Sequence, residues 1–180
     1  MNWKRLSSVL IVVLLLTAAV AILVNHFHIP DFAVIKPGVL YTSGQPRGMD
    51  YTRLLYKYHI ATIVNVRLIS EHRNHNWYHE EISWAKNNSV NLIELPIEKA
   101  NYFPNEDIQQ KFLEVMSTKS NLPVLLHGST DDERVAMLTA VWLSKALGYN
   151  AEEAIGEVKK IIDDRNLTEA ELQFITALAK

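Results

Sequence analysis

The chain has 180 residues, of which 48% are hydrophobic and 21% are charged, and its formal net charge is −2. This balance is typical of one domain that buries a core, and a near-neutral chain without a long basic run argues against nucleic acid as a partner. The chain has no cysteine, which excludes disulfides, cysteine zinc sites and thiolate catalysis.

The N-terminal segment predicts an uncleaved membrane anchor. Residues 6–24 carry no charged side chain, and the segment is close to the ~20 residues that cross a bilayer core as a helix. A cleaved signal peptide is the main alternative, with Ala19 and Ala21 at its cleavage site, but the apolar run continues past both alanines. A buried core helix is less consistent with a segment that is apolar on every face.

Two charges before the apolar run predict the side of the membrane on which the domain lies. Lys4 and Arg5 precede the run, and positively charged flanks stay in the cytoplasm. We therefore expect a single-pass membrane protein whose domain faces the periplasm or the cell exterior. Residues 1–25 would form the anchor, 26–31 a linker and 32–180 the domain.

The rest of the chain alternates short apolar strands with helices. A brief apolar segment is expected at 39–41, strands at 61–66, 91–95 and 123–126, and helices at 50–58, 70–88, 105–117, 133–147, 150–162 and from Thr168 onward, with Asp50, Asn150 and Thr168 as caps. This alternation predicts an α/β fold with a largely parallel central sheet flanked by helices. Sites in such sheets gather beyond the carboxyl ends of the strands, which directs attention to the turn after Leu126.

That turn reads His-Gly-Ser-Thr-Asp-Asp-Glu-Arg over residues 127–134. Backbone N–H groups of such a turn, next to a helix N-terminus, can form an anion site, and Arg134 could clamp a phosphate with its planar guanidinium. Capping is the alternative that we favour. Thr130 with Glu133, or Ser129 with Asp132, has the spacing of a capping box, so the acidic residues would satisfy the helix end themselves.

His127 followed by Arg134 on a strand–loop–helix resembles the signature of the cysteine-dependent tyrosine and dual-specificity phosphatases, which is His-Cys, five variable residues, then Arg. Other stretches resemble the atypical dual-specificity branch, in the same order: 37–41, 43–46, 63–67 with Glu71, 95–97 and 152–155. The likeness covers roughly residues 32–165. It implies a phosphatase-like fold with no metal or cofactor.

The resemblance also assigns roles to residues of this chain. It places the family's ligand-binding loop at His127, Ser129, Thr130 and Arg134, and its general acid near Glu98. A surface position is the alternative for Glu98. Arg67 ends a strand on the same rim, where it would pair with Glu71 or a loop acid, or contribute to an anion pocket.

The chain departs from the family pattern inside the loop. Gly128 stands at the position of the catalytic cysteine, so the phosphocysteine route is closed. Asp131 replaces a loop glycine, and Val135 replaces the hydroxyl residue after the arginine. A phosphate dianion ~4 Å from one carboxylate is opposed by about 2 kcal/mol even at the dielectric constant of water. We regard Asp131 as the most damaging change.

His72, His75 and His79, with Glu80, are spaced for one face of the helix expected at 70–88. Such a face can bind a metal, but a solvated face is the interpretation that we favour.

Two functions from different classes follow. The first is a membrane-anchored pseudophosphatase that acts as a binding or scaffolding module, with a phosphorylated or anionic ligand or a protein as its partner. The alternative is a diverged phosphoric-ester hydrolase that uses a non-cysteine route, with Ser129, Thr130 or Asp131 as nucleophile.

Overall fold

The computed structural model describes residues 10–17, 20, 29–129, 132–162 and 165–179. Residues 10–17 form a helix whose side chains are exposed. Within the described stretches, no helix is both long and apolar enough to cross a bilayer. Most of the expected anchor at 1–25 and linker at 26–31 lies outside these stretches, so the anchor remains a prediction from the sequence.

The central sheet has five strands in the order β1-β2-β5-β3-β4. They are β1 (Ala33–Lys36), β2 (Leu40–Ser43), β3 (Thr62–Asn65), β4 (Asn91–Glu94) and β5 (Val124–His127). β2, β5, β3 and β4 run parallel, and β1 pairs antiparallel with β2 at the edge. The register places Ser43 and Asn65 on either side of His127, so the polar residues that end three strands meet at one rim.

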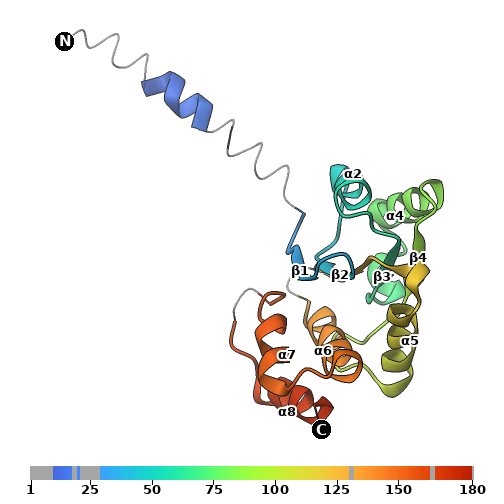
Figure 1. The fold of residues 1–180 in the computed structure, drawn as a ribbon. Helices are drawn as coiled ribbons and strands as arrows, with labels where there is room; N and C mark the ends of the chain where they lie inside the picture. The colour runs from blue at the N-terminus through green and yellow to red at the C-terminus, as the bar shows by residue number, and fades with distance from the viewer. Residues whose placement is uncertain (1–9, 18–19, 21–28, 130–131, 163–164, 180) are drawn as a thin grey trace.

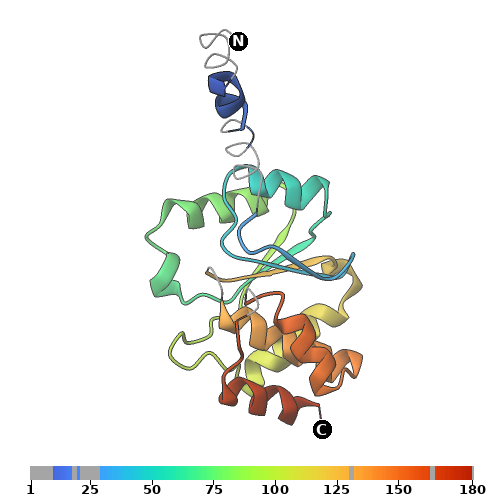
Figure 2. The ribbon, with the colours of Figure 1, turned by 90° about the vertical axis from the view of Figure 1, so that its left-hand side faces the viewer.

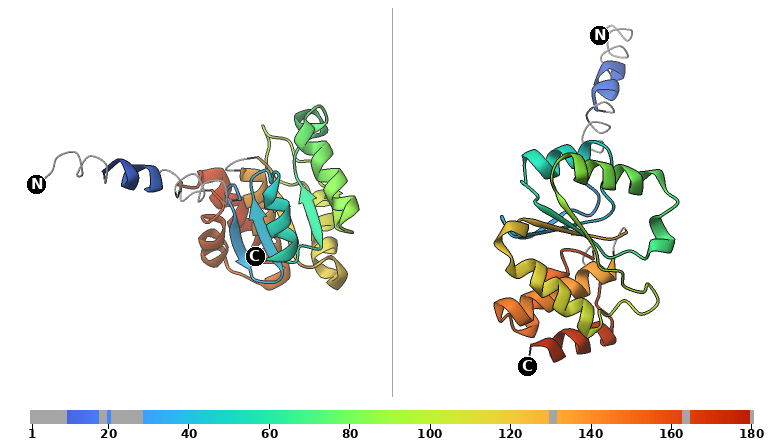
Figure 3. Two further views of the ribbon diagram at one scale, coloured as in Figure 1. Left: turned by 90° about the horizontal axis from the view of Figure 1, so that it is seen from above. Right: turned by 90° about the vertical axis from the view of Figure 1, so that its right-hand side faces the viewer.

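Helices cover both faces of this sheet (Figures 1 and 2). In chain order they are α2 (Met49–Tyr56), α3 (Ile69–His72), α4 (Asn76–Asn87), α5 (Glu106–Ser117), the 3₁₀ turn η1 (Lys119–Asn121), α6 (Glu133–Leu147), α7 (Ala151–Val158) and α8 (Glu169–Leu178). α2 and α4 form the layer on one face, while α5, α6, α7 and α8 form the layer on the other (Figure 3). The predicted α/β class with a mostly parallel, helix-flanked sheet is therefore confirmed.

Each face of the sheet has its own buried cluster. Leu125 belongs to the cluster under α2 and α4, whereas Leu126, its neighbour, belongs to the larger cluster under α5–α8. Successive side chains of a strand point to opposite faces, so the unbroken apolar strand β5 serves both clusters. α6 packs in the larger cluster and is buried along most of its length.

The helix ends follow local sequence signals. Asn150 and Thr168 cap α7 and α8, each with a complete capping box, and α6 stops at Gly148 in the left-handed conformation. Asp50 is not the cap of α2, since Gly48 occupies that position and Asp50 instead accepts a hydrogen bond from the N–H of Arg47. These signals explain why α6, α7 and α8 begin where they were expected to begin, although α7 ends at Val158 and not at residue 162.

The helix expected at 70–88 is wrong as a single element, because it is divided into α3 and α4. α3 ends at His72 and α4 starts after His75, which is extended (φ −103°, ψ 136°). The break turns His72 into the protein, where its ring lies 4.1 Å from the ring of Tyr78 and its Nε2 lies 3.4 Å from Oε1 of Glu94. The edge strand β1 was not anticipated either.

Candidate functional site

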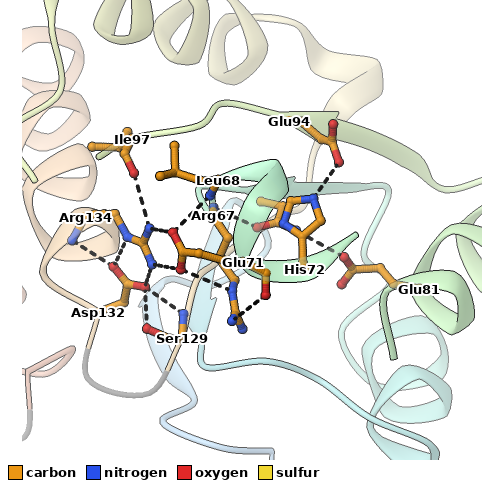
Figure 4. A network of polar contacts seen from close by, with 11 residues as sticks. Arg67, Leu68, Glu71, His72, Glu81, Glu94, Ile97, Ser129, Asp132 and Arg134 are labelled. Carbon is orange, nitrogen blue, oxygen red and sulfur yellow. Dashed lines mark hydrogen bonds and ion pairs between the residues drawn. The ribbon is translucent and has the colours of Figure 1, made fainter. Parts of the chain in front are cut away.

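The candidate site lies at the carboxyl ends of β3 and β5, in the turn that leads into α6 (Figure 4). His127 ends β5, and Asp132 is the N-cap of α6. Gly128 and Ser129 connect them on the described side of the turn. Thr130 and Asp131, which the sequence placed among the ligand-binding and disruptive residues, lie outside the described residues.

Arg134 is buried in the first turn of α6, with 1% of its surface exposed, and all five N–H groups of its guanidinium have acceptors. Asp132 accepts from Nε at 2.8 Å and from Nη2 at 2.7 Å. Glu71 accepts from Nη1 at 2.6 Å and from Nη2 at 3.2 Å, and the carbonyl oxygen of Ile97 accepts from Nη1 at 3.2 Å. The side chain that the resemblance assigns to ligand binding therefore donates to the chain's own acceptors.

The charges of these partners control the titration of the arginine. Burial alone would lower the pKa of Arg134, but hydrogen bonds to Asp132 and Glu71 and the two negative charges raise it above its ordinary value. In return, burial would raise the pKa of the Asp132 carboxyl, and the bonds to Arg134 and Ser129 hold it below the usual range. The arginine thus stays cationic beside two anionic carboxylates.

Asp132 occupies the space that a side chain at position 128 would need. An ideal Cβ built on Gly128 would lie 2.2 Å from Oδ2 of Asp132 and 2.5 Å from its Cγ. The same Oδ2 accepts from the backbone N–H of Ser129 at 2.6 Å and from Oγ of Ser129 at 2.9 Å. Donors of the loop and of Arg134 converge on one centre, and that centre is a carboxylate of the chain itself.

An acidic residue therefore caps the helix, as expected, but neither of the two predicted capping boxes has its first residue at the N-cap. Asp132 rather than Ser129 or Thr130 is the N-cap, and its Oδ1 accepts from the N–H of Arg134 at 3.0 Å. Its other oxygen makes the return bond to Ser129 that the Ser129–Asp132 spacing predicted. One side chain thus caps the helix and neutralises the arginine.

Arg67 reaches the same cluster from the end of β3. Its Nε lies 3.7 Å from Oε2 of Glu71, and its guanidinium lies over the ring of Trp77, 4.6 Å from the ring centre. Burial lowers the pKa of Arg67, and the nearby positive charge of Arg134 lowers it further. The negative charge of Glu71 opposes this shift but does not cancel it. Glu71 is therefore shared by both arginines, and it also accepts from the N–H of Leu68 at the start of α3.

Glu98 does not join this group of side chains. It follows Ile97, whose carbonyl oxygen contacts Arg134, but its own side chain is exposed. Glu98 therefore lies at the surface, which was the alternative to the general-acid position that the resemblance implied.

A buried pair behind the loop was missed by sequence reasoning. Nε2 of His127 lies 3.1 Å from Oε1 of Glu81, and both side chains are fully buried. Gln45, Tyr51 and Asn65 also donate to the Glu81 carboxylate. Burial would raise the pKa of Glu81, but His127 and the hydrogen bonds from Gln45 and Tyr51 hold it below its ordinary value. The only signal in the sequence is a charge on the buried side of α4, one turn before Ala85.

The three histidines do not form a metal site. His72 is buried in α3, His75 is the N-cap of α4, and His79 is an exposed residue of α4. In the part of the chain that the structure describes, no group of three potential ligands is placed to hold a metal ion. The prediction that all three histidines lie on a solvated helix face is wrong for His72, which is buried because the chain breaks between α3 and α4.

Comparison with solved structures identifies the fold. The core catalytic domain of the PP-IP phosphatase SIW14 from S. cerevisiae superposes with a TM-score of 0.65 at 18% identity, over 82% of this chain and 85% of that one. PTPMT1 in complex with PI(5)P gives 0.63 at 16% identity, over 82% and 94%.

Tk-PTP in its active form gives a TM-score of 0.63 at 17% identity, over 83% of this chain and 97% of that one. No protein-family model matches the sequence. At these identities the similarity establishes the architecture and not the activity. The chain therefore has the fold of the cysteine-based tyrosine and dual-specificity-like phosphatases.

Proposed function

We propose that this protein is a membrane-anchored pseudophosphatase, a binding or scaffolding module that keeps the phosphatase fold and does not turn over phosphate esters. The observation that supports this most directly is the Asp132 carboxylate, which occupies the space beside Gly128 and accepts hydrogen bonds from Ser129 and Arg134. Position 128 supplies no side chain to attack phosphorus.

The charges of the loop act in the same direction. Arg134 and Arg67 carry two positive charges, and Asp132 and Glu71 balance them with two negative charges. A phosphate dianion that displaced neither carboxylate would find no excess positive charge, and at ~4 Å one carboxylate opposes it by about 2 kcal/mol even in water. A phosphorylated or anionic ligand would have to displace Asp132, so we assign the binding role to surfaces outside the loop.

The diverged-hydrolase alternative has one contact in its favour. Oγ of Ser129 donates to Asp132 at 2.9 Å, and this is the geometry of a nucleophile beside a base. However, the bonds from Arg134 and Ser129 lower the pKa of Asp132, and a carboxylate with a lowered pKa is a poor base for a hydroxyl. Nε2 of His127 faces Glu81 at 3.1 Å rather than Ser129.

Turnover measurements separate the two functions. Purified full-length protein is assayed with p-nitrophenyl phosphate and a panel of phosphate esters, with and without divalent metals, beside Ser129→Ala and Arg134→Ala variants. The pseudophosphatase assignment predicts the background rate for all three proteins. Hydrolysis by the wild type that either substitution abolishes would support the hydrolase and overturn the proposal.

The anchoring part of the proposal rests on residues 6–24 and on Lys4 and Arg5. A reporter enzyme fused to the C-terminus tests its orientation. An extracytoplasmic signal is expected, and a cytoplasmic signal would contradict the proposed topology.

A further inference from the structure

The distance between the apolar segment and the folded domain is short. The uncharged run ends at Val24, and Ile29 is already buried in the domain, with 4% of its surface exposed. Whatever conformation residues 25–28 adopt, five Cα–Cα steps span at most about 18 Å. A domain of this size has a radius of gyration of about 15 Å and is roughly 40 Å across, so an anchored domain cannot turn its far side to the membrane.

The buried attachment point determines which side is near. Ile29 belongs to the cluster that contains Tyr51 and Leu54 of α2, on the face of the sheet that α2 and α4 cover. The carbonyl oxygen of Pro30 accepts from the N–H of Gly44 in the segment that leads into α2. The layer of α5–α8 lies on the opposite face (Figures 1 and 2). The α2 layer is therefore the one held close to the bilayer.

The outer face of α2 has the chemistry of a membrane interface. Met49 and Tyr56 are exposed, at 50% and 74%, and lie on the side of α2 away from buried Tyr51 and Leu54. Tyrosine is enriched at membrane–water interfaces. Exposed cations flank the helix at Arg47 and Lys57, and an anionic lipid surface attracts such side chains.

Charge differs between the two layers. On the α2–α4 side, the exposed charged residues within residues 44–90 are the cations Arg47, Lys57, Arg73 and Lys86 and the acid Glu80. The acid of α2 itself, Asp50, is buried and bonded to Arg47 and Arg53. The opposite layer exposes acids and cations in nearly equal number: Glu106, Asp107, Glu114, Glu152, Glu153 and Glu169 against Lys111, Lys119, Lys145, Lys159 and Lys160. The excess of positive charge is therefore confined to the α2–α4 side.

We propose that the exposed surface formed by Met49 and Tyr56 of α2, together with Arg47 and Lys57 at its two ends, docks on the anionic headgroups of the bilayer in which the chain is anchored. This inference rests on the anchored state proposed above. Each cation at an anionic surface shifts the balance toward the docked state by about five-fold, and the short tether holds the face within reach. Docking would fix the orientation of the domain, with α5–α8 directed away from the membrane.

The absence of native cysteine gives a direct test. Full-length protein carrying Tyr56→Cys, or Ala177→Cys on exposed α8 as a matched control, is labelled with a fluorophore and reconstituted in phosphatidylcholine nanodiscs with or without phosphatidylglycerol. Quenching by headgroup-nitroxide lipid reports contact with the surface. We expect stronger quenching at position 56 than at 177 when phosphatidylglycerol is present, and its loss in high salt.

Charge reversal on each side supplies the second control. Arg47→Glu with Lys57→Glu should reduce quenching at position 56, whereas Lys119→Glu with Lys159→Glu, an equal charge change on the other side, should not. Equal quenching at 56 and 177, or indifference to phosphatidylglycerol and salt, would overturn the docking. Shielding of position 56 from an aqueous quencher in neutral detergent would indicate a second copy instead, and would also overturn it.

Carbonate extraction keeps the two proposals distinguishable. A chain that carbonate releases from vesicles contradicts the anchor, and with it the docking. A chain that stays in the vesicles but shows no difference between positions 56 and 177 contradicts the docking alone.

Discussion

Oδ2 of Asp132 lies 2.2 Å from the point where a Cβ at Gly128 would begin. No real Cβ approaches a carboxylate oxygen so closely, so glycine at 128 and the inward position of Asp132 depend on each other. Substitution at either residue should therefore disturb the other.

Restoring the cysteine should not restore activity. In Gly128→Cys the new side chain must expel Asp132 from its bonds with Ser129 and Arg134, and overpacking of this kind costs about 1–3 kcal/mol. We expect a lower midpoint in urea unfolding and no hydrolysis of p-nitrophenyl phosphate. Gly156→Cys on α7 is the matched control, because a Cβ there meets nothing within 4 Å, and its midpoint should not fall. Turnover by Gly128→Cys would show that the loop opens readily.

Removing the carboxylate should expose the arginine. Asp132→Ala takes two acceptors from Arg134 and the cap from α6, and loss of one partner of a buried ion pair costs about 3–5 kcal/mol. Asp132→Ser keeps a capping residue and separates the two contributions. Inorganic phosphate should raise the melting temperature of Asp132→Ser and leave the wild type unchanged, since only the variant has unoccupied donors. An equal shift in both proteins would contradict the account.

Acid should destabilise the protein through the same carboxylates. The folded state holds the pKa values of Asp132 and Glu71 below their ordinary range, so each contributes stability above its unfolded pKa of about 4. That stability is lost as the pH falls through the folded values. The free energy of unfolding should decline below about pH 4.5, and less steeply in Glu71→Gln. A parallel decline in both proteins would exclude this origin.

The buried pair of Glu81 and His127 should stabilise the folded state. Glu81→Ala leaves His127 and three donors without the carboxylate, and we expect a loss of about 3 kcal/mol in stability. Exposed Glu80 is the matched control, and Glu80→Ala should change stability by no more than about 0.5 kcal/mol. The comparison is made by urea unfolding of both variants, and similar losses would argue against the buried network.

The parts of the fold that the sequence predicted depend on local signals. Asn150 and Thr168 cap helices because each sits before an apolar, 3.6-periodic segment, and Gly148 ends α6 because it tolerates positive φ. The break after His72 has no glycine or proline to mark it. Burial of His72 against Glu94 is a tertiary contact that overrides the local preference.

The parts of the site that the sequence missed depend on contacts between distant residues. Glu71 meets Arg134 only because β3 and β5 are neighbours. Glu81 meets His127 only because α4 packs on the face of the sheet that Leu125 of β5 faces. Two adjacent acids, Asp131 and Asp132, look alike in sequence, and we singled out Asp131. Spacing alone could not reveal that Asp132 would turn inward to Arg134.

A crystal structure of the protein grown at neutral pH in phosphate shows which group the donors of the loop bind. We expect the Asp132 carboxylate to accept from the Ser129 N–H and from Nε and Nη2 of Arg134, with no anion between these donors. A phosphate bonded to the same three N–H groups, with Asp132 turned away, would contradict it.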